Sequence, residues 1–176
     1  MNTKQITRCA LMTALIAVLS PISIPLSTMV PISLATFAVM LGGAILGPVY
    51  GTLSTGLYLL LGAIGIPVFA GYTSGVQILF GMTGGYLFGY LPLAYCTGWA
   101  SEKTEGKTWQ LVAGMVIGTV ILYVLGTVWF MLYMKMPLGA SLAACVIPFL
   151  PGDAVKIAVV ALIAPRIKAA VNHAAR

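Results

Sequence analysis

Charged residues are scarce in this sequence. Only 7% of its 176 residues are Asp, Glu, Lys or Arg, whereas 60% are hydrophobic. A soluble domain carries about 25% charged residues, so the composition excludes one. A membrane-spanning helix needs about 20 mostly apolar residues. The length therefore allows five or six spans, and we expect one transmembrane domain over residues 1–176 without an additional enzymatic or ATP-binding module.

Acidic residues and histidine are the scarcest, with three and one in the chain. Zinc sites use clusters of Cys, His and carboxylates, and a Ser-His-Asp triad needs a central histidine. The only histidine, His173, stands near the C-terminus, and Cys9, Cys96 and Cys145 are isolated in apolar runs. The sequence also lacks a Gly-rich loop ending in Gly-Lys-Ser/Thr. We expect no enzyme, no metal site and no cofactor, so any ATP hydrolysis has to come from a partner.

Apolar runs separated by proline, glycine or polar segments predict an all-α integral membrane bundle of six transmembrane helices. The last helix contains Pro148, Pro151 and Gly152. Proline lacks a backbone donor and disfavours helix in the residue before it. We therefore expect this helix to break near 148–152 and to restart at Asp153. The six predicted helices cover residues 5–19, 32–46, 49–64, 76–100, 109–132 and 139–171.

The net charge of +6 comes from basic residues beside the predicted helices, which argues against nucleic acid as a partner. Six helices place both termini on one side. The segments on that side hold seven basic residues, and the other side holds only Lys135. By the positive-inside rule, we expect a multi-pass cell-membrane protein with cytoplasmic termini. The seven residues are Lys4, Arg8, Lys103, Lys107, Arg166, Lys168 and Arg176.

Asp153 and Lys156 form an ionisable pair inside an otherwise apolar run. Each charge at bilayer depth costs about 2.5–3.5 kcal/mol on insertion scales. Residues three apart share a helix face, and transporters hold small polar substrates at helix breaks within the membrane. The pair is therefore either a structural lock or part of a substrate site. The proline-punctuated segment 20–31 is long enough to fold over such a site as a lid.

Two stripes of small residues each allow two interpretations. Ala10 and Ala14 form a close-packing face within the bundle or a docking face for a separate membrane protein. Along the predicted helix 76–100, a second stripe recurs every four residues and serves close helix packing or leaves a slot for a ligand. The second stripe consists of Gln77, Gly81, Gly85 and Gly89.

Several segments, in this order along the chain, resemble the BioY family. Its members are the biotin-specific S components of energy-coupling-factor (ECF) transporters. The resemblance covers about residues 10–165. The segments that carry it are residues 36–44 (TFAVMLGGA), 46–48 (LGP), 65–71 (GIPVFAG), 83–87 (TGGYL) and 148–156 (PFLPGDAVK).

The resemblance implies a six-helix S component that binds biotin from outside and supports its uptake. It also implies partnership with a membrane-embedded coupling protein and two cytosolic ATPases, which alone use ATP. In the family, the small-residue face of the first helix docks on the coupling protein. This favours a docking role for Ala10 and Ala14.

Biotin has a ureido ring with two N–H donors and one carbonyl, an apolar thiolane ring and a chain ending in a carboxylate. We expect Asp153 to accept ureido N–H bonds. Lys156 either neutralises Asp153 or bonds an oxygen of the ligand. Gln77 and Tyr86 offer further donors, and Phe69 can cover the ring. The alternatives are an S component for a different vitamin and a non-transporting structural subunit in which the Asp–Lys pair is a lock.

Overall fold

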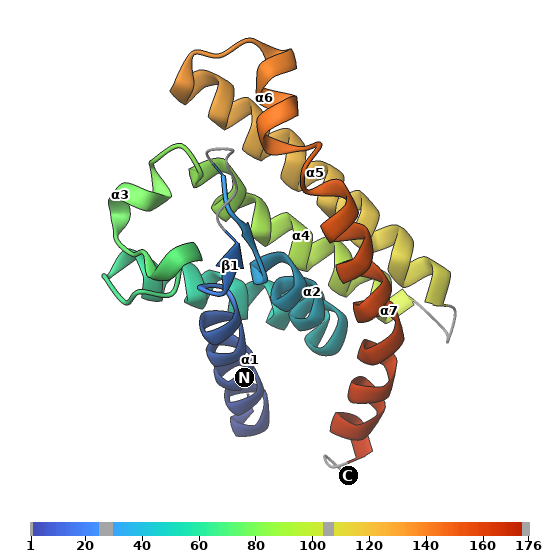
Figure 1. Cartoon of the computed structure of the whole chain (residues 1–176). Helices are drawn as coiled ribbons and strands as arrows, with labels where there is room; N and C mark the ends of the chain where they lie inside the picture. Colours follow the sequence, from blue (N-terminus) through green and yellow to red (C-terminus); the bar gives the residue numbers. More distant parts are fainter. Residues whose placement is uncertain (1, 25–29, 104–107, 174–176) are drawn as a thin grey trace.

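The computed structural model of the chain describes residues 2–24, 30–103 and 108–173, and in these residues it is a helical bundle (Figure 1). Short helical elements lie between the long helices: η1 (Ala70–Tyr72), α3 (Val76–Leu79) and α6 (Leu138–Cys145). The predicted all-α fold is confirmed. The long helices are α1 (Thr3–Leu19), α2 (Ala35–Ala63), α4 (Gly84–Lys103), α5 (Thr108–Met134) and α7 (Leu150–His173).

Helix α2 consists of two helical segments that meet at Gly47. This residue has φ 81° and ψ 180°, and Pro48 follows it. Glycine adopts a positive φ without a steric penalty, and proline is well suited to the first residue of the next helical segment. The turn predicted between the second and third helices is therefore present. The first segment begins at Ala35 and not at residue 32, because Ile32 and Ser33 form a strand.

By length and composition, α2 and α5 can each cross a membrane, and α6 with α7 qualifies as one span bent by 47°. When the two segments of α2 are counted separately and the short η1 and α3 are left aside, the described chain contains six helical segments. These are α1, the two segments of α2, α4, α5 and the bent α6–α7 pair. This arrangement agrees with the predicted six-helix bundle.

The break before Asp153 lies slightly earlier than predicted. Helix α6 ends at Cys145 and α7 begins at Leu150, so Asp153 lies within the first turn of α7 and does not begin it. The backbone N–H of Asp153 donates to the Phe149 carbonyl at 2.8 Å, which closes that turn. Pro151 is tolerated there because the first residues of a helix need no backbone donor.

The predicted helix 76–100 is also interrupted, between α3 and α4. The chain folds back tightly here: a Cβ on Gly84 would lie 2.0 Å from the Leu79 carbonyl oxygen. The Gly81 carbonyl accepts from the Gly84 N–H at 3.0 Å and from the indole of Trp129 on α5 at 2.9 Å. The continuous helix that we predicted over these residues is therefore wrong, because glycines and a tertiary hydrogen bond stabilise a turn.

One end of the bundle carries a small hairpin beside the loop 65–75. Strands β1 (Ser23–Ile24) and β2 (Ile32–Ser33) pair antiparallel. The N–H of Gly71 donates to the Pro21 carbonyl at 3.1 Å and joins the loop to the hairpin segment. The central part of the predicted lid, residues 25–29, lies outside the described residues.

The opposite end carries both termini (Figure 1). Arg8 of α1 donates to the Val171 carbonyl of α7 at 3.0 Å, and Lys168 of α7 donates to Ser101 Oγ of α4 at 2.8 Å. This agrees with an even number of spans. The side of the membrane that this end faces stays a prediction, and the predicted inner residues Lys107 and Arg176 lie outside the described residues.

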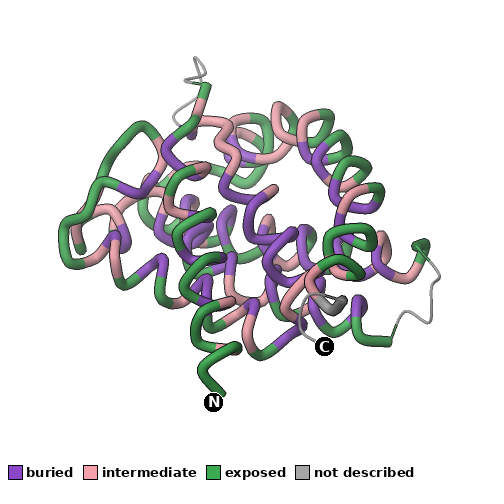
Figure 2. The backbone as a smooth tube through the Cα atoms, turned by 90° about the horizontal axis from the view of Figure 1, so that it is seen from below, coloured by how far each residue is buried: buried purple, intermediate pink, exposed green. Residues whose placement is uncertain are grey.

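Glycines bring α4 and α5 into close contact. A Cβ on Gly85 would lie 2.3 Å from Trp129 Cβ, and a Cβ on Gly118 would lie 3.1 Å from Leu93 Cα. Buried residues gather where the helices face one another, and exposed residues follow the outer faces (Figure 2). Gly85 of the predicted stripe therefore serves helix packing, the first of the two interpretations.

Gly98 provides a test of this packing. A Cβ there would lie 2.4 Å from backbone atoms of Gly47 and Pro48, whereas a Cβ on Gly56 meets only Leu91 Cδ2 at 3.9 Å. We expect Gly98→Ala to destabilise the fold by about 1–3 kcal/mol through overpacking. Gly56→Ala, the matched control, should be neutral or slightly stabilising. Thermal unfolding in detergent measures both, and equal midpoints would contradict the close contact.

Candidate ligand-binding site

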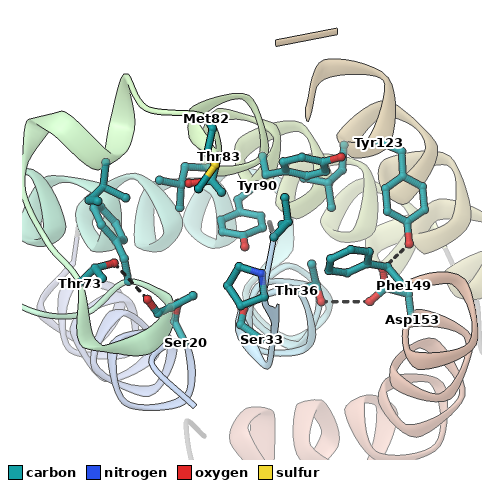
Figure 3. A pocket seen from close by; sticks show the side chains of 18 of the residues that line it. Ser20, Ser33, Thr36, Thr73, Met82, Thr83, Tyr90, Tyr123, Phe149 and Asp153 are labelled. Atoms are coloured by element: carbon teal, nitrogen blue, oxygen red, sulfur yellow. Dashed lines mark hydrogen bonds between the residues drawn. The ribbon is translucent and has the colours of Figure 1, made fainter. Parts of the chain in front are cut away.

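A cavity of about 230 Å³ lies between the helices and the hairpin end of the bundle. Its walls come from almost every element, from the end of α1 to the first turns of α7. Two polar groups of side chains stand at opposite ends of the cavity (Figure 3). Ser20 and Thr73 lie at one end, and Tyr123 and Asp153 lie at the other, with Tyr90 between them.

Asp153 lies at the centre of a buried hydrogen-bond network, with 4% of its surface exposed. Its Oδ1 accepts from Lys156 Nζ at 2.9 Å and from Thr36 Oγ1 at 3.3 Å. Its Oδ2 accepts from the Tyr123 hydroxyl at 2.6 Å. A carboxylate offers about four acceptor positions. Three are occupied by described residues, so among these residues Oδ2 is left able to accept one further hydrogen bond from a group in the cavity.

All three hydrogen-bond donors of the Lys156 ammonium have partners within the protein. Besides Asp153, its ammonium donates to the Ser33 carbonyl at 2.8 Å and to Thr36 Oγ1 at 2.9 Å. An ammonium has three donors, and all three have partners here. Lys156 can therefore bond a ligand only by giving up one of these contacts, and in this arrangement it neutralises Asp153.

Aromatic side chains shape the other end of the cavity. Phe69 is 1% exposed and meets the Tyr58 ring edge-on, with centroids 5.7 Å apart. The Tyr58 hydroxyl is 2.6 Å from Ser20 Oγ. A Cβ on Gly62 would lie 2.0 Å from Phe69 Cζ, so the ring occupies the space that this glycine leaves. Phe69 therefore lies in the wall of the cavity.

Tyr86 forms part of the wall between these ends. Its hydroxyl donates to the Cys145 carbonyl at 3.2 Å and lies 3.4 Å from Thr127 Oγ1. The ring packs against Gly126, where a Cβ would come within 2.3 Å. These contacts fix Tyr86 between α5 and the end of α6.

The structure brings together Asp153, Lys156, Tyr86 and Phe69 around one cavity and places Gln77 elsewhere. Gln77 is exposed, and its Nε2 donates to the Ser74 carbonyl at 3.0 Å. The prediction for Gln77 depended on a continuous helix. The break between α3 and α4 separates this residue from the helix that carries Tyr86.

Thr36 and Tyr123, two of the three donors to Asp153, were not among the predicted site residues. Tyr123 stands in the middle of a long apolar run, and Thr36 precedes another. These isolated hydroxyls were a usable signal. Their pairing with residue 153 depends on contacts across 117 and 30 positions, which no local pattern reveals.

Ala10 and Ala14 are exposed on α1. Large apolar side chains, including Leu11 and Val18, are exposed on the same helix at 66% and 67%. The packing of the bundle therefore leaves this surface of α1 open.

Chemically, the cavity suits a small molecule with an N–H donor at the Asp153 end and an apolar body. Its lining is largely aromatic and aliphatic, as in most small-molecule sites. Among the described residues, no group of three His, Cys, Asp or Glu residues is arranged to hold a metal ion.

Comparison with known proteins gives a consistent result over nearly the whole chain. The BioY family matches residues 1–173. The chain is 42% identical to the biotin transporter BioY of Thermotoga maritima over 165 residues, which cover 94% of this chain and 96% of that protein. It is 39% identical to the biotin transporter BioY of Rhodobacter capsulatus over 173 residues, covering 92% and 91%.

Among solved structures, the fold is similar to the S-component for biotin from an ECF-type ABC transporter. The TM-score is 0.88 at 31% identity, and the match covers 96% of this chain and 94% of that one.

The role of Tyr123 in holding Asp153 can be tested without a ligand. We expect Tyr123→Phe to destabilise the protein by about 1–3 kcal/mol, because it removes a donor from a buried carboxylate. Tyr133, on the same helix, is 55% exposed, and Tyr133→Phe should change stability by less than about 0.5 kcal/mol. Thermal unfolding of the ligand-free variants measures the difference. Equal losses in both variants would mean that the hydrogen bond to Asp153 contributes nothing.

Proposed function

The chain belongs to the BioY family, and we infer that it is the biotin-specific S component of an energy-coupling-factor transporter. It binds biotin and supports its uptake across the membrane, with biotin as a ligand and without enzymatic activity of its own. One observation carries the site assignment: the buried Asp153 carboxylate keeps one free acceptor position on the wall of an otherwise largely apolar cavity.

We place the ureido ring of biotin at the Asp153 end. A ureido N–H that donates to Oδ2 would fill its remaining acceptor position, and hydrogen bonds to an ionised group are the stronger ones. Lys156 stays with Asp153, Thr36 and Ser33 and compensates the carboxylate charge. Of the two roles considered for Lys156, this geometry supports neutralisation.

The remaining parts of biotin follow from this orientation. The apolar thiolane ring would pack against Tyr86 and Phe69, which both line the cavity. The chain would then direct its carboxylate towards Ser20 and Thr73, whose hydroxyls lie at the far end (Figure 3). Hydroxyl groups can donate to a carboxylate once they leave their present intramolecular partners.

Transport requires the other components of the ECF module. We propose that the exposed α1 surface around Ala10 and Ala14 docks on the membrane-embedded coupling protein, which in turn joins two cytosolic ATPases. Small residues let helix backbones approach closely in a membrane. The orientation that fits is cytoplasmic termini, with the hairpin end and its cavity facing outside, as the positive-inside rule predicts.

Replacing the acidic group tests the site. We expect Asp153→Asn to weaken biotin binding at least about 100-fold, or about 2.7 kcal/mol, because an amide is a weaker acceptor than a carboxylate. Glu102→Gln, the same chemical change at the opposite end of the bundle, should leave affinity unchanged. Isothermal titration in detergent measures both. Wild-type affinity in the Asn variant would remove Asp153 from the contacts, and tighter binding of another vitamin by the native chain would overturn biotin as the ligand.

Docking is separable from binding. We expect Ala14→Trp to abolish biotin uptake by cells that contain the complete ECF module, because the bulky ring prevents close helix approach. Biotin binding by the purified variant should be normal. Val120→Trp on α5, where Val120 is 54% exposed, is the matched control and should transport biotin. Normal uptake by the Ala14 variant would show that this surface of α1 is not the docking face.

A further inference from the structure

A second hollow lies on the outside of the bundle, between α4 and α5. Its volume is about 370 Å³, and its lining is mostly apolar. Its residues run from Tyr95 to Lys103 on α4 and from Trp109 to Ile117 on α5. Each run covers eight helical steps, or about 12 Å at 1.5 Å per residue. The hollow is therefore a groove along the seam of the two helices, separate from the cavity around Asp153.

The groove has one polar end. Lys103 Nζ lies 4.3 Å from the centre of the Trp99 ring. Within the described part of the chain, no carboxylate lies within 4.0 Å of this ammonium. The neighbouring Glu102 lines a different hollow, together with Arg8 and Lys168. The groove thus contains a cation, the Lys103 ammonium, whose charge is not compensated by a carboxylate among the described residues.

Gln110 is the second polar residue at this end. Its Oε1 is buried and has no hydrogen-bond partner among the described residues. A small rotation of the side chain would direct it to a hydroxyl donor in the groove. Trp99 and Trp109 flank the same end and are 49% and 67% exposed. Tryptophans of this kind are typical of the boundary between lipid tails and headgroups.

The position in the bundle fixes the depth of the groove. Ser101 on α4 contacts Lys168 on α7, and α7 contacts Arg8 on α1, so the polar end of the groove lies at the end that carries both termini. From there the groove runs into the apolar part of the bundle, where Tyr95 and Ile117 line it. Its charge and aromatic rings therefore meet the headgroup layer, and its apolar part meets the lipid tails.

We propose that this α4–α5 groove binds an anionic phospholipid. The phosphate accepts from Lys103, a headgroup hydroxyl donates to Gln110 Oε1, and an acyl chain follows the groove past Ala113. A helix from another protein fits less well. A docking helix would meet side chains along the whole groove, whereas among the described lining residues the only charge is that of Lys103, at one end. Phosphatidylglycerol has both the anion and the hydroxyl that this end requires.

Native mass spectrometry of the delipidated full chain tests the proposal with two probes. These are phosphatidylglycerol and phosphatidylcholine with identical acyl chains. We expect one phosphatidylglycerol to bind preferentially and Lys103→Gln to weaken it about fivefold, the effect of about 1 kcal/mol per cation near an anionic surface. Lys135→Gln is the matched control, since Lys135 is an exposed lysine at the opposite end. It should leave binding unchanged.

A second variant separates the contribution of the apolar groove to lipid binding from that of the Lys103 charge. Ala113→Phe fills the apolar part and should reduce binding while leaving Lys103 in place. Biotin affinity, measured in parallel, should stay normal in all three variants and shows that they are folded. Equal binding of both lipids, or equal losses in the Lys103 and Lys135 variants, would overturn the proposal. Recovery of a protein in the groove in place of the lipid would also overturn it.

Discussion

The organisation of this protein depends on neutralising one carboxylate inside an apolar bundle. An uncompensated charge at such a site costs several kcal/mol, which is a large part of the stability of a small protein. Lys156 lies one turn along the same helix, and Thr36 and Tyr123 approach from α2 and α5. Three helices are therefore fixed relative to one another by the requirement to satisfy Asp153.

The same network explains why the site can accept a ligand and still exist without one. All three donors of Lys156 have protein partners, so the cation needs nothing from the cavity. Asp153 keeps one acceptor position, so the network is nearly complete and has one opening for a donor. A ligand with an N–H group gains a charge-assisted hydrogen bond there and does not have to break an ion pair.

The sequence was sufficient for the helical class, the bent last span and the central pair, because charge is rare in apolar runs and proline acts locally. The sequence was insufficient for features that depend on tertiary packing. Pro151 was predicted to end a helix but lies in a first turn, where its missing donor has no cost. Gln77 was placed on one continuous helix with Gly81 and Gly85, but a turn held by Trp129 separates α3 from α4. The donors Thr36 and Tyr123 meet Asp153 only in the folded bundle.

The two ends of the cavity differ in the number of hydrogen bonds that hold their walls together. This difference determines where a ligand can enter. At the Asp153 end, hydrogen bonds join α2, α5 and α7, and opening that end would expose an ion pair to lipid. At the other end, the segment around Pro21 and the loop 65–75 are joined by the bond from Gly71 to Pro21, whereas strand β2 is held to Lys156 through the Ser33 carbonyl. Segments with few buried contacts open at lower free energy than helices in a core. Exchange of ligand is therefore expected between the segment around Pro21 and the loop 65–75, while the Asp153 end keeps its geometry.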